Sequence, residues 1–158
     1  MNIRPAKTDD MYDVLQLIKE LATFEKEPDA VEITVEDLIR DGFSDTPLFN
    51  VIVAEHNQKI IGMALYYNRY STWKGKTIHL EDLIVTETMR GTGAGYALYA
   101  EIMNIAKREG VRRVEWVVLN WNEAAINFYK KSGASVLEDW YTVQMDYNGI
   151  EKFSNSKL

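Results

Sequence analysis

The sequence predicts an α+β fold built on a mixed, mostly antiparallel sheet of six to seven strands flanked by about four helices. Strand-sized apolar runs are more numerous than helical patterns, and two pairs of runs are joined by hairpin signals, Asn57-Gln58 and Lys74-Gly75. One long helical pattern lies between two strand patterns, which indicates a βαβ unit with parallel strands. The predicted order is β-α-α-β-β-β-α-β-α-β-β.

Residues 2–6 are predicted to form a short strand, and Thr8 to cap the helix that follows. A second helix is expected over 34–42, with Thr34 as its cap and Gly42 as its stop. Helical spacing of apolar residues supports the first helix, over 9–23: Met11, Val14, Leu15, Ile18 and Leu21.

Alternating and continuous apolar runs then predict strands over 49–55, 60–69 and 76–86. A helix over 93–109 follows and ends at Gly110, and 112–119 (RRVEWVVL) has the composition of a buried strand.

The last part of the chain is expected to hold one more helix and two strands. Asn122 can cap a helix over 123–132 that ends at Gly133. The final strands are predicted over 135–138 and 140–146, and the tail from Asn148 is expected to be frayed.

Composition predicts one domain over residues 1–158, large enough for a real core. Hydrophobic residues make up 46% and charged residues 27%, which is typical of globular proteins. No apolar run is long enough to span a membrane, and the polar N-terminus lacks a signal core, so we expect a cytoplasmic protein.

The chain has no cysteine, which excludes disulfides, thiolate catalysis and cysteine-bound zinc. Only His56 and His79 are present, and their separation argues against a metal site. A net charge of −6 disfavours nucleic acid and favours a cationic partner. Residues 20–45 contain nine acids and two bases, a pattern equally typical of a solvated helix face.

The glycine-rich stretch Arg90-Gly91-Thr92-Gly93-Ala94-Gly95-Tyr96 connects the strand over 76–86 to the helix over 93–109. The first amides of a helix have no internal acceptor, and the helix dipole adds positive charge. Glycine permits close approach, so this turn is suited to bind a diphosphate, with Arg90 at its rim. A tight turn that only needs positive φ is the alternative.

Three anion-binding patterns were compared with this turn. No lysine follows the glycines, so a P-loop does not fit. The sixth position of a G-x-G-x-x-G fingerprint is Tyr96 or Leu98, so a dinucleotide site does not fit either. Arg90, Gly93 and Gly95 satisfy the third pattern, Arg/Gln-x-x-Gly-x-Gly/Ala.

Together with NWNEAAINFYKKSGA at 120–134, that third pattern resembles the GNAT superfamily of acyl-CoA N-acetyltransferases. The resemblance implies a GNAT fold in which the strand before the glycine turn splays from its neighbour in a V. It also implies acetyl-CoA as cofactor, with its diphosphate at residues 90–96 and its pantetheine along Leu83, Ile84 and Val85. Tyr129 would then lie near the departing sulfur.

Longer strings resemble the diamine (spermidine/spermine) N-acetyltransferase family along nearly the whole chain: ELATFE, EDLIRDGF, YSTWKGKTIHLEDLIV and WNEAAINFYKKSGA. Polyamine-preferring members carry an acid near Ser71, which is missing here. YSTWKGKT looks more like the branch that prefers thialysine. The resemblance also implies a homodimer, often joined through the C-terminal strands.

The chemistry assigns roles to these residues. A primary amine must lose a proton before it attacks a thioester, which requires a carboxylate. Glu81 and Asp82 are adjacent, so in a regular strand they point to opposite faces. The resemblance selects Glu81 as the base, acting through water, with Asp82 as a second contact at a strand bulge. Tyr129 is expected to protonate the thiolate, and Asn122 to serve both as helix cap and near pantetheine.

The acceptor pocket is expected to be acidic and aromatic. Tyr70 and Trp73 can offer cation–π contacts, and acids after the first helix can line the entrance: Glu25, Glu27 and Asp29. Without cysteine, direct transfer in a ternary complex follows. The alternatives are a GNAT enzyme for another amine, such as an aminoglycoside or a protein N-terminus, and a non-catalytic acyl-CoA-binding module.

Overall fold

The computed structural model describes residues 1–156, and its chain divides into two compact units, Met1–Val117 and the remainder from Val118. Among the described residues, no helix is long and apolar enough to cross a membrane. The prediction of a single domain over 1–158 stays a prediction.

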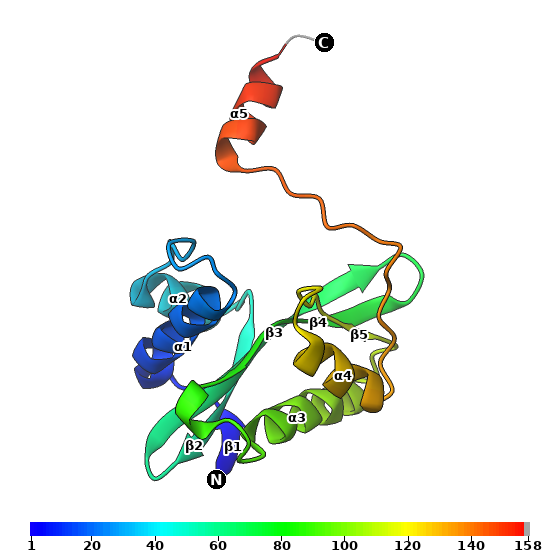
Figure 1. Ribbon diagram of the computed structural model, residues 1–158. Coiled ribbons are helices and arrows are strands. Elements are labelled where there is room, and N and C mark those ends of the chain that lie inside the picture. The colour runs from blue at the N-terminus through cyan, green and yellow to red at the C-terminus, as the bar shows by residue number, and fades with distance from the viewer. Residues whose placement is uncertain (157–158) are drawn as a thin grey trace. The chain divides into compact units, whose positions relative to one another are not determined.

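The first unit is built on a five-stranded sheet whose spatial order follows the chain, β1-β2-β3-β4-β5 (Figure 1). The first four strands pair antiparallel, and β5 pairs parallel with β4 through Ile78↔Val114 and His79↔Glu115. The strands are β1 (Asn2–Pro5), β2 (Asn50–His56), β3 (Lys59–Ser71), β4 (Gly75–Val85) and β5 (Val114–Glu115). The predicted α+β class and the parallel βαβ unit are confirmed.

Helices cover both faces of this sheet (Figure 1). On one face, α1 (Met11–Phe24) and α2 (Val35–Gly42) pack on a core that includes Val53, Met63 and Leu65. On the other, α3 (Ala94–Glu109) packs its Leu98 and Ile102 on Ala64, Ile78 and Leu80. Alternation of apolar residues along β3 and β4 supplies both cores, because successive side chains point to opposite faces.

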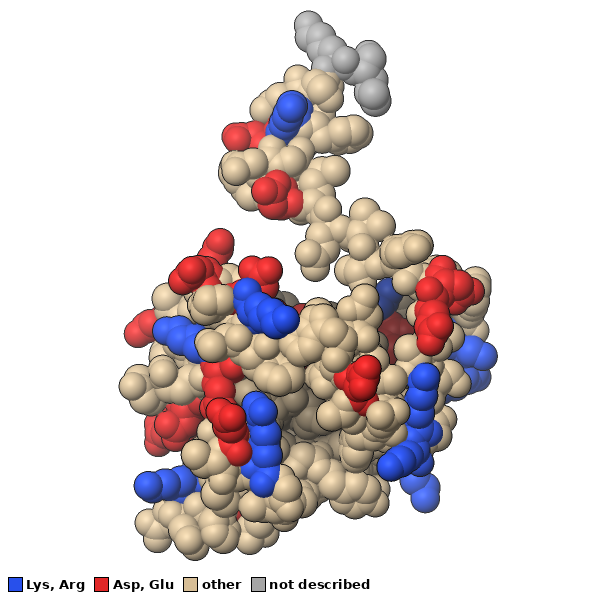
Figure 2. Space-filling model, in the orientation of Figure 1, with Lys and Arg blue, Asp and Glu red and all other residues tan. Residues whose placement is uncertain are grey.

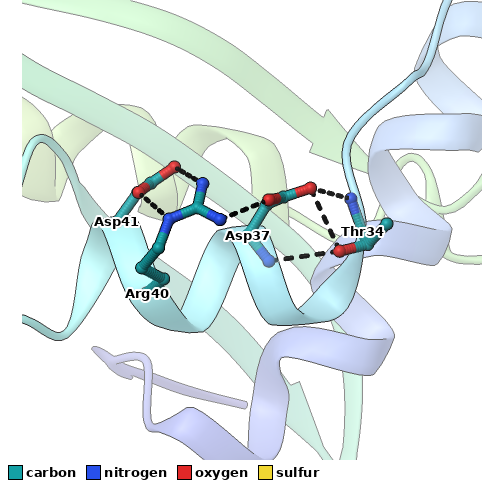
Figure 3. Close-up of polar contacts among 4 residues, drawn as sticks. All are labelled: Thr34, Asp37, Arg40 and Asp41. Carbon is teal, nitrogen blue, oxygen red and sulfur yellow. Dashed lines mark hydrogen bonds and ion pairs between the residues drawn. The ribbon is translucent and has the colours of Figure 1, made fainter.

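Local sequence signals fix most helix ends. At α2, the Thr34 side chain accepts a hydrogen bond from the Asp37 amide, and the Asp37 carboxylate accepts one from the Thr34 amide. This reciprocal capping box satisfies two amides that the helix cannot. Arg40 donates to the carboxylates of Asp37 and Asp41, as Figure 3 shows. The predicted Thr34 cap is confirmed.

Two N-terminal details differ from the prediction. Thr8 does not cap α1, because Thr8–Asp10 form a short 3-10 turn, η1, that precedes the helix. The Asp10 carboxylate accepts hydrogen bonds from the Lys7 amide, at 2.7 Å, and from the Arg4 guanidinium. The turn is therefore capped by its own last residue. A second 3-10 turn, η2 (Glu87–Met89), lies between β4 and the glycine-rich turn.

The predicted strand over 112–119 is much shorter than expected. Only Val114 and Glu115 pair with β4, although the segment is apolar enough for eight strand residues. A strand is defined by its ladder, and pairing with β4 stops after His79.

In the second unit, α4 (Glu123–Lys131) begins at Asn122, whose side chain accepts from the Ala125 amide at 3.2 Å, as predicted. The strands predicted over 135–138 and 140–146 are absent: neither segment has a partner strand among the described residues, and a strand needs one. The expectation of a frayed tail from Asn148 is wrong for the described part, because Tyr147–Asn155 form α5, capped by Asp146.

Candidate active site

The glycine-rich turn is open on its outer side. Gly91 and Gly93 have φ angles of 77° and 88°, a region that residues with a Cβ adopt only with strain. A Cβ built on either glycine would meet no atom within 4 Å. The positive φ angles therefore explain the two glycines, and the space beside them is free for a ligand.

The amides of this turn have no acceptor within the part of the chain that the structure describes. Among residues 1–156, no backbone amide from Gly91 to Tyr96 donates to another residue, and the first helical hydrogen bond runs from Ala97 to the Gly93 carbonyl at 3.0 Å. These amides lie at the N-terminal end of a 16-residue helix, whose dipole adds partial positive charge. The arrangement can bind a diphosphate.

Arg90 precedes this group of amides and is held by two contacts. Its guanidinium lies over the Phe24 ring, 5.2 Å from the centroid, and its Nε donates weakly to the Val85 carbonyl at 3.4 Å. The Thr92 hydroxyl donates to the Met89 carbonyl at 2.7 Å and closes the turn. Ala94 is buried beneath it, and a Cβ built on Gly95 would meet the Val85 side chain at an ordinary contact distance of 3.7 Å.

The C-terminal half of β4 has one free edge. From Leu80 to Val85 this strand pairs with β3, but β5 reaches only Ile78 and His79. The residues predicted to border pantetheine lie in this part of β4, which pairs with β3 but not with β5: Leu83, Ile84 and Val85. Among the described residues no strand pairs with them on the side away from β3, so an extended ligand could add there, although the Val85 carbonyl already accepts weakly from Arg90.

A bulge places Glu81 and Asp82 on the same face of β4. Leu65 pairs with Asp82 and Tyr66 with Leu80, so Glu81 has no partner in the ladder. Leu65 belongs to the core under α1 and α2, which places Asp82 on that face. Glu81 joins it there, because its carboxylate contacts Tyr67, two residues beyond Leu65 on β3. The expectation of opposite faces is wrong, since the extra residue breaks the alternation.

The gathered carboxylates affect one another. Burial, together with the negative charges of Glu81 and Glu25, raises the pKa of Asp82 to about 6. Partial loss of hydration also raises the pKa of Glu25, which follows α1. No cation of the protein pairs with Asp82 among the residues that the structure describes. An incoming ammonium would supply the missing counter-charge.

Acidic side chains also gather more widely over α1 and α2, as Figure 2 shows. This is the part of the surface formed by residues 20–45. Glu20 has a structural role that the sequence did not indicate, because its carboxylate accepts from the Glu87 amide at 2.7 Å and ties α1 to η2. Glu27 is exposed in the loop after α1.

Two neighbours of Glu81 were missed from the sequence. The Tyr67 hydroxyl donates to Glu81 Oε2 at 3.0 Å, and His79 Nε2 lies 3.5 Å from the same oxygen. The one sequence feature that could have indicated His79 is its spacing from Glu81, because residues two apart on a strand point to the same face.

The structure does not bring the hairpin aromatics to these carboxylates. Trp73 and Tyr70 lie at the β3–β4 turn and are 77% and 78% exposed. Gly75 and Glu81 are six residues apart on β4, about 20 Å at the usual strand rise. The role of Trp73 in binding an amine stays a prediction.

Asn122 and Tyr129 belong to the second unit, and their predicted roles stay predictions. Tyr129 lies in the last part of α4, is partly buried, and packs edge-on against Phe128 with ring centroids 5.4 Å apart. Within residues 1–156, no three His, Asp or Glu side chains are arranged to hold a metal ion.

Comparison with known proteins identifies the family. Residues 9–134 match the family described as Acetyltransferase (GNAT) family. Thialysine N-epsilon-acetyltransferase from Bos taurus is 38% identical over 163 aligned residues, covering 96% of both chains. Spermidine/spermine N(1)-acetyltransferase-like protein 1 from Homo sapiens is 40% identical over 88% of this chain, which spans only 21% of that protein.

A solved structure shares the fold over nearly the whole chain. The integron cassette protein VCH_CASS6 from the mobile metagenome of V. cholerae superposes with a TM-score of 0.80 at 26% identity, covering 98% of both chains. The predicted GNAT fold is confirmed, and the described residues form five strands in place of the six to seven expected.

The raised pKa of Asp82 predicts a stabilising variant. Between the unfolded value near 3.8 and about 6, the folded state binds more protons than the unfolded state, so stability falls as pH rises through this window. Above it the full penalty applies, up to about 3 kcal/mol. Asp82→Asn should therefore raise the melting temperature at pH 7.5, and the gain should vanish near pH 4.

Asp29→Asn, at an exposed position after α1, is the matched control and should change little at either pH. Equal effects of Asp82→Asn at both pH values, measured by thermal unfolding, would contradict the interpretation of Asp82 as a destabilised charge.

The open amides, the neighbouring Arg90 and the unpaired edge of β4 fit a diphosphate joined to an extended, amide-bearing arm, as in coenzyme A. This agreement and the sequence match lead to one conclusion: the chain belongs to the GNAT acetyltransferase family and is an N-acetyltransferase that uses acetyl-CoA as acetyl donor.

Proposed function

We propose that this enzyme acetylates the primary amine of a small cationic acceptor: a diamine, a polyamine, or a thialysine- or lysine-like amino acid. The observation that carries the proposal is the gathering of Glu81, Asp82 and Glu25 beside the unpaired edge of β4. Such a concentration of negative charge favours an ammonium and disfavours an anionic acceptor.

Acetyl-CoA supplies the acetyl group as a thioester. The amides from Gly91 to Tyr96 would hold its diphosphate, and Arg90 would add positive charge at the rim. The free edge of β4 at Leu83–Val85 would hold the pantetheine arm through backbone hydrogen bonds. Asn122, besides capping α4, would contact the same arm.

On the acceptor side, Asp82 and Glu25 would bind the ammonium, because Asp82 is buried beside negative charges and forms no ion pair with a cation among the described residues. Glu81 would then accept the proton of the amine, directly or through one water. Its side chain is 52% exposed, which leaves room for that water. Glu27 would lie at the outer part of the acceptor site, whereas the distance of the Trp73 hairpin from Glu81 leaves Trp73 outside the site of a small acceptor.

Tyr129 would act as the general acid. A phenol is protonated at neutral pH and can donate to the sulfur as the carbon–sulfur bond breaks. The ammonium first gives one proton to Glu81, directly or through water. The neutral nitrogen then bonds to the acetyl carbon as the carbon–sulfur bond breaks, and the sulfur receives the proton of Tyr129. The second proton that the nitrogen loses restores the Tyr129 phenol, and Glu81 releases its proton to solvent. No cysteine is present to carry the acetyl group, so transfer is direct.

The acceptor is proposed to be lysine-like in preference to a long polyamine. The bovine relative that matches over 96% of both chains is named for thialysine. Ser71 occupies the position near which polyamine-preferring members carry an acid. Its hydroxyl accepts from the amides of Trp73 and Lys74 and so forms part of the turn, and it offers no charge to a distant ammonium.

An amine panel tests the acceptor class. Free-thiol release from acetyl-CoA should be fastest with thialysine or lysine, slower with putrescine and spermidine, and absent with an aminoglycoside.

Tyr129→Phe should reduce kcat about 100-fold or more while coenzyme A still binds. Tyr12→Phe, exposed on α1, should leave turnover unchanged. A non-catalytic binding module would bind coenzyme A and release no thiol with any amine.

We also propose that two copies form a homodimer through residues 135–146. Large apolar side chains are exposed along this segment of the second unit. The two most exposed are Tyr141, at 91%, and Val143, at 89%, which are two residues apart as on one face of a strand. The strand pattern of this segment has no partner within the described chain, and a second copy can supply one.

Sedimentation should therefore give twice the chain mass of 18.2 kDa. Val143→Lys should shift the protein toward monomer, because a buried unpaired charge opposes strand pairing. Leu48→Lys, at a 70% exposed position of the first unit, is the control and should stay dimeric. A monomeric wild-type protein would refute the assembly without affecting the proposed reaction.

A further inference from the structure

Two side chains that no family motif indicated converge on a single oxygen of Glu81. Tyr67 on β3 pairs in register with His79 on β4, and Glu81 follows His79 by two residues on the same face. The Tyr67 hydroxyl lies 3.0 Å from Glu81 Oε2, and His79 Nε2 lies 3.5 Å from the same atom. Both therefore approach Oε2 and not Oε1.

The surroundings of His79 select one tautomer. Its side chain is 13% exposed, and its Nδ1 is buried with no hydrogen-bond partner among residues 1–156. A proton on Nδ1 would be a buried donor without an acceptor, which is costly. A proton on Nε2 instead points at the carboxylate of Glu81. The Tyr67 ring, 5.2 Å away and tilted by 32°, restricts rotation of the imidazole.

The other charges near this group are paired with one another. Glu115 lies opposite His79 in the parallel ladder and forms ion pairs with Arg69 on β3 and with Arg113, which directly precedes β5. These arginines are therefore engaged away from Glu81. Among the described residues of β3, β4 and β5, Tyr67 and His79 are the donors that reach Glu81.

We infer that Tyr67 and His79 are positioning residues for the catalytic base, an inference that rests on the proposed role of Glu81. Their hydrogen atoms hold Oε2, so that Oε1 stays free to accept the proton of the amine or of the intervening water. Without them, a half-exposed carboxylate on a bulge would sample several rotamers. Tyr67 makes the stronger contact, because 3.5 Å exceeds the usual hydrogen-bond length.

Kinetics with matched variants test this assignment. Tyr67→Phe should lower kcat roughly three- to tenfold, the effect of one lost hydrogen bond, and His79→Leu should lower it by a smaller factor because its contact is longer; KM for acetyl-CoA should not change. His79→Gln should recover most of the loss, because its amide N–H can reach the position of Nε2. In a Glu81→Gln background, neither substitution should lower kcat further.

Nitrogen-15 NMR of the imidazoles provides an independent readout that needs no substrate. The chain has only two histidines, so His56→Gln assigns the signals. We expect the neutral His79 ring to carry its proton on Nε2. Thermal unfolding serves as the control that the variants fold.

An Nδ1–H tautomer, wild-type kcat in His79→Leu and Tyr67→Phe, or failure of His79→Gln to exceed His79→Leu would overturn the inference. Failure of the proposed function is distinguishable, because Glu81→Gln would then keep full activity or no amine would react at all, whichever tautomer His79 shows.

Discussion

The amides at the N-terminal end of α3 are the feature on which the site depends. Six consecutive backbone donors lack acceptors within the described chain, and two positive-φ glycines keep side chains out of the space before them. A protein leaves such donors at its surface at little cost, because water satisfies them. A diphosphate can replace that water with several charge-assisted hydrogen bonds at once. The βαβ topology sets the place of this group, since α3 must begin where β4 ends.

Two irregularities of β4 make the region beside the glycine-rich turn a candidate catalytic site. Its pairing with β5 ends after His79, which frees an edge beside the turn. Its bulge at Glu81 turns two adjacent carboxylates to one face. A regular strand would have placed one of them in the core under α3, where an unpaired charge is costly. Instead, Asp82 lies near both Glu81 and Glu25, and its burial, together with these two negative charges, raises its pKa to about 6.

The regular elements could be predicted from sequence because local chemistry determines them. The capping box at Thr34, the left-handed Gly110 after α3 and the turn at Asn57-Gln58 all act over a few residues. The glycine-rich turn was predictable for the same reason. The short β5 and the missing strands over 135–146 were not, because a strand depends on whether another chain segment pairs with it. Contacts across the sheet, such as Tyr67 with Glu81, depend on register, which a bulge shifts.

The most direct test of the central claim compares two ligands that differ in the diphosphate. Titration calorimetry with coenzyme A should give micromolar binding, and pantetheine, which lacks the diphosphate, should bind at least about 100-fold more weakly because several charge-assisted hydrogen bonds are lost. Equal affinities for the two ligands, or no heat with coenzyme A, would contradict the account of the turn before α3.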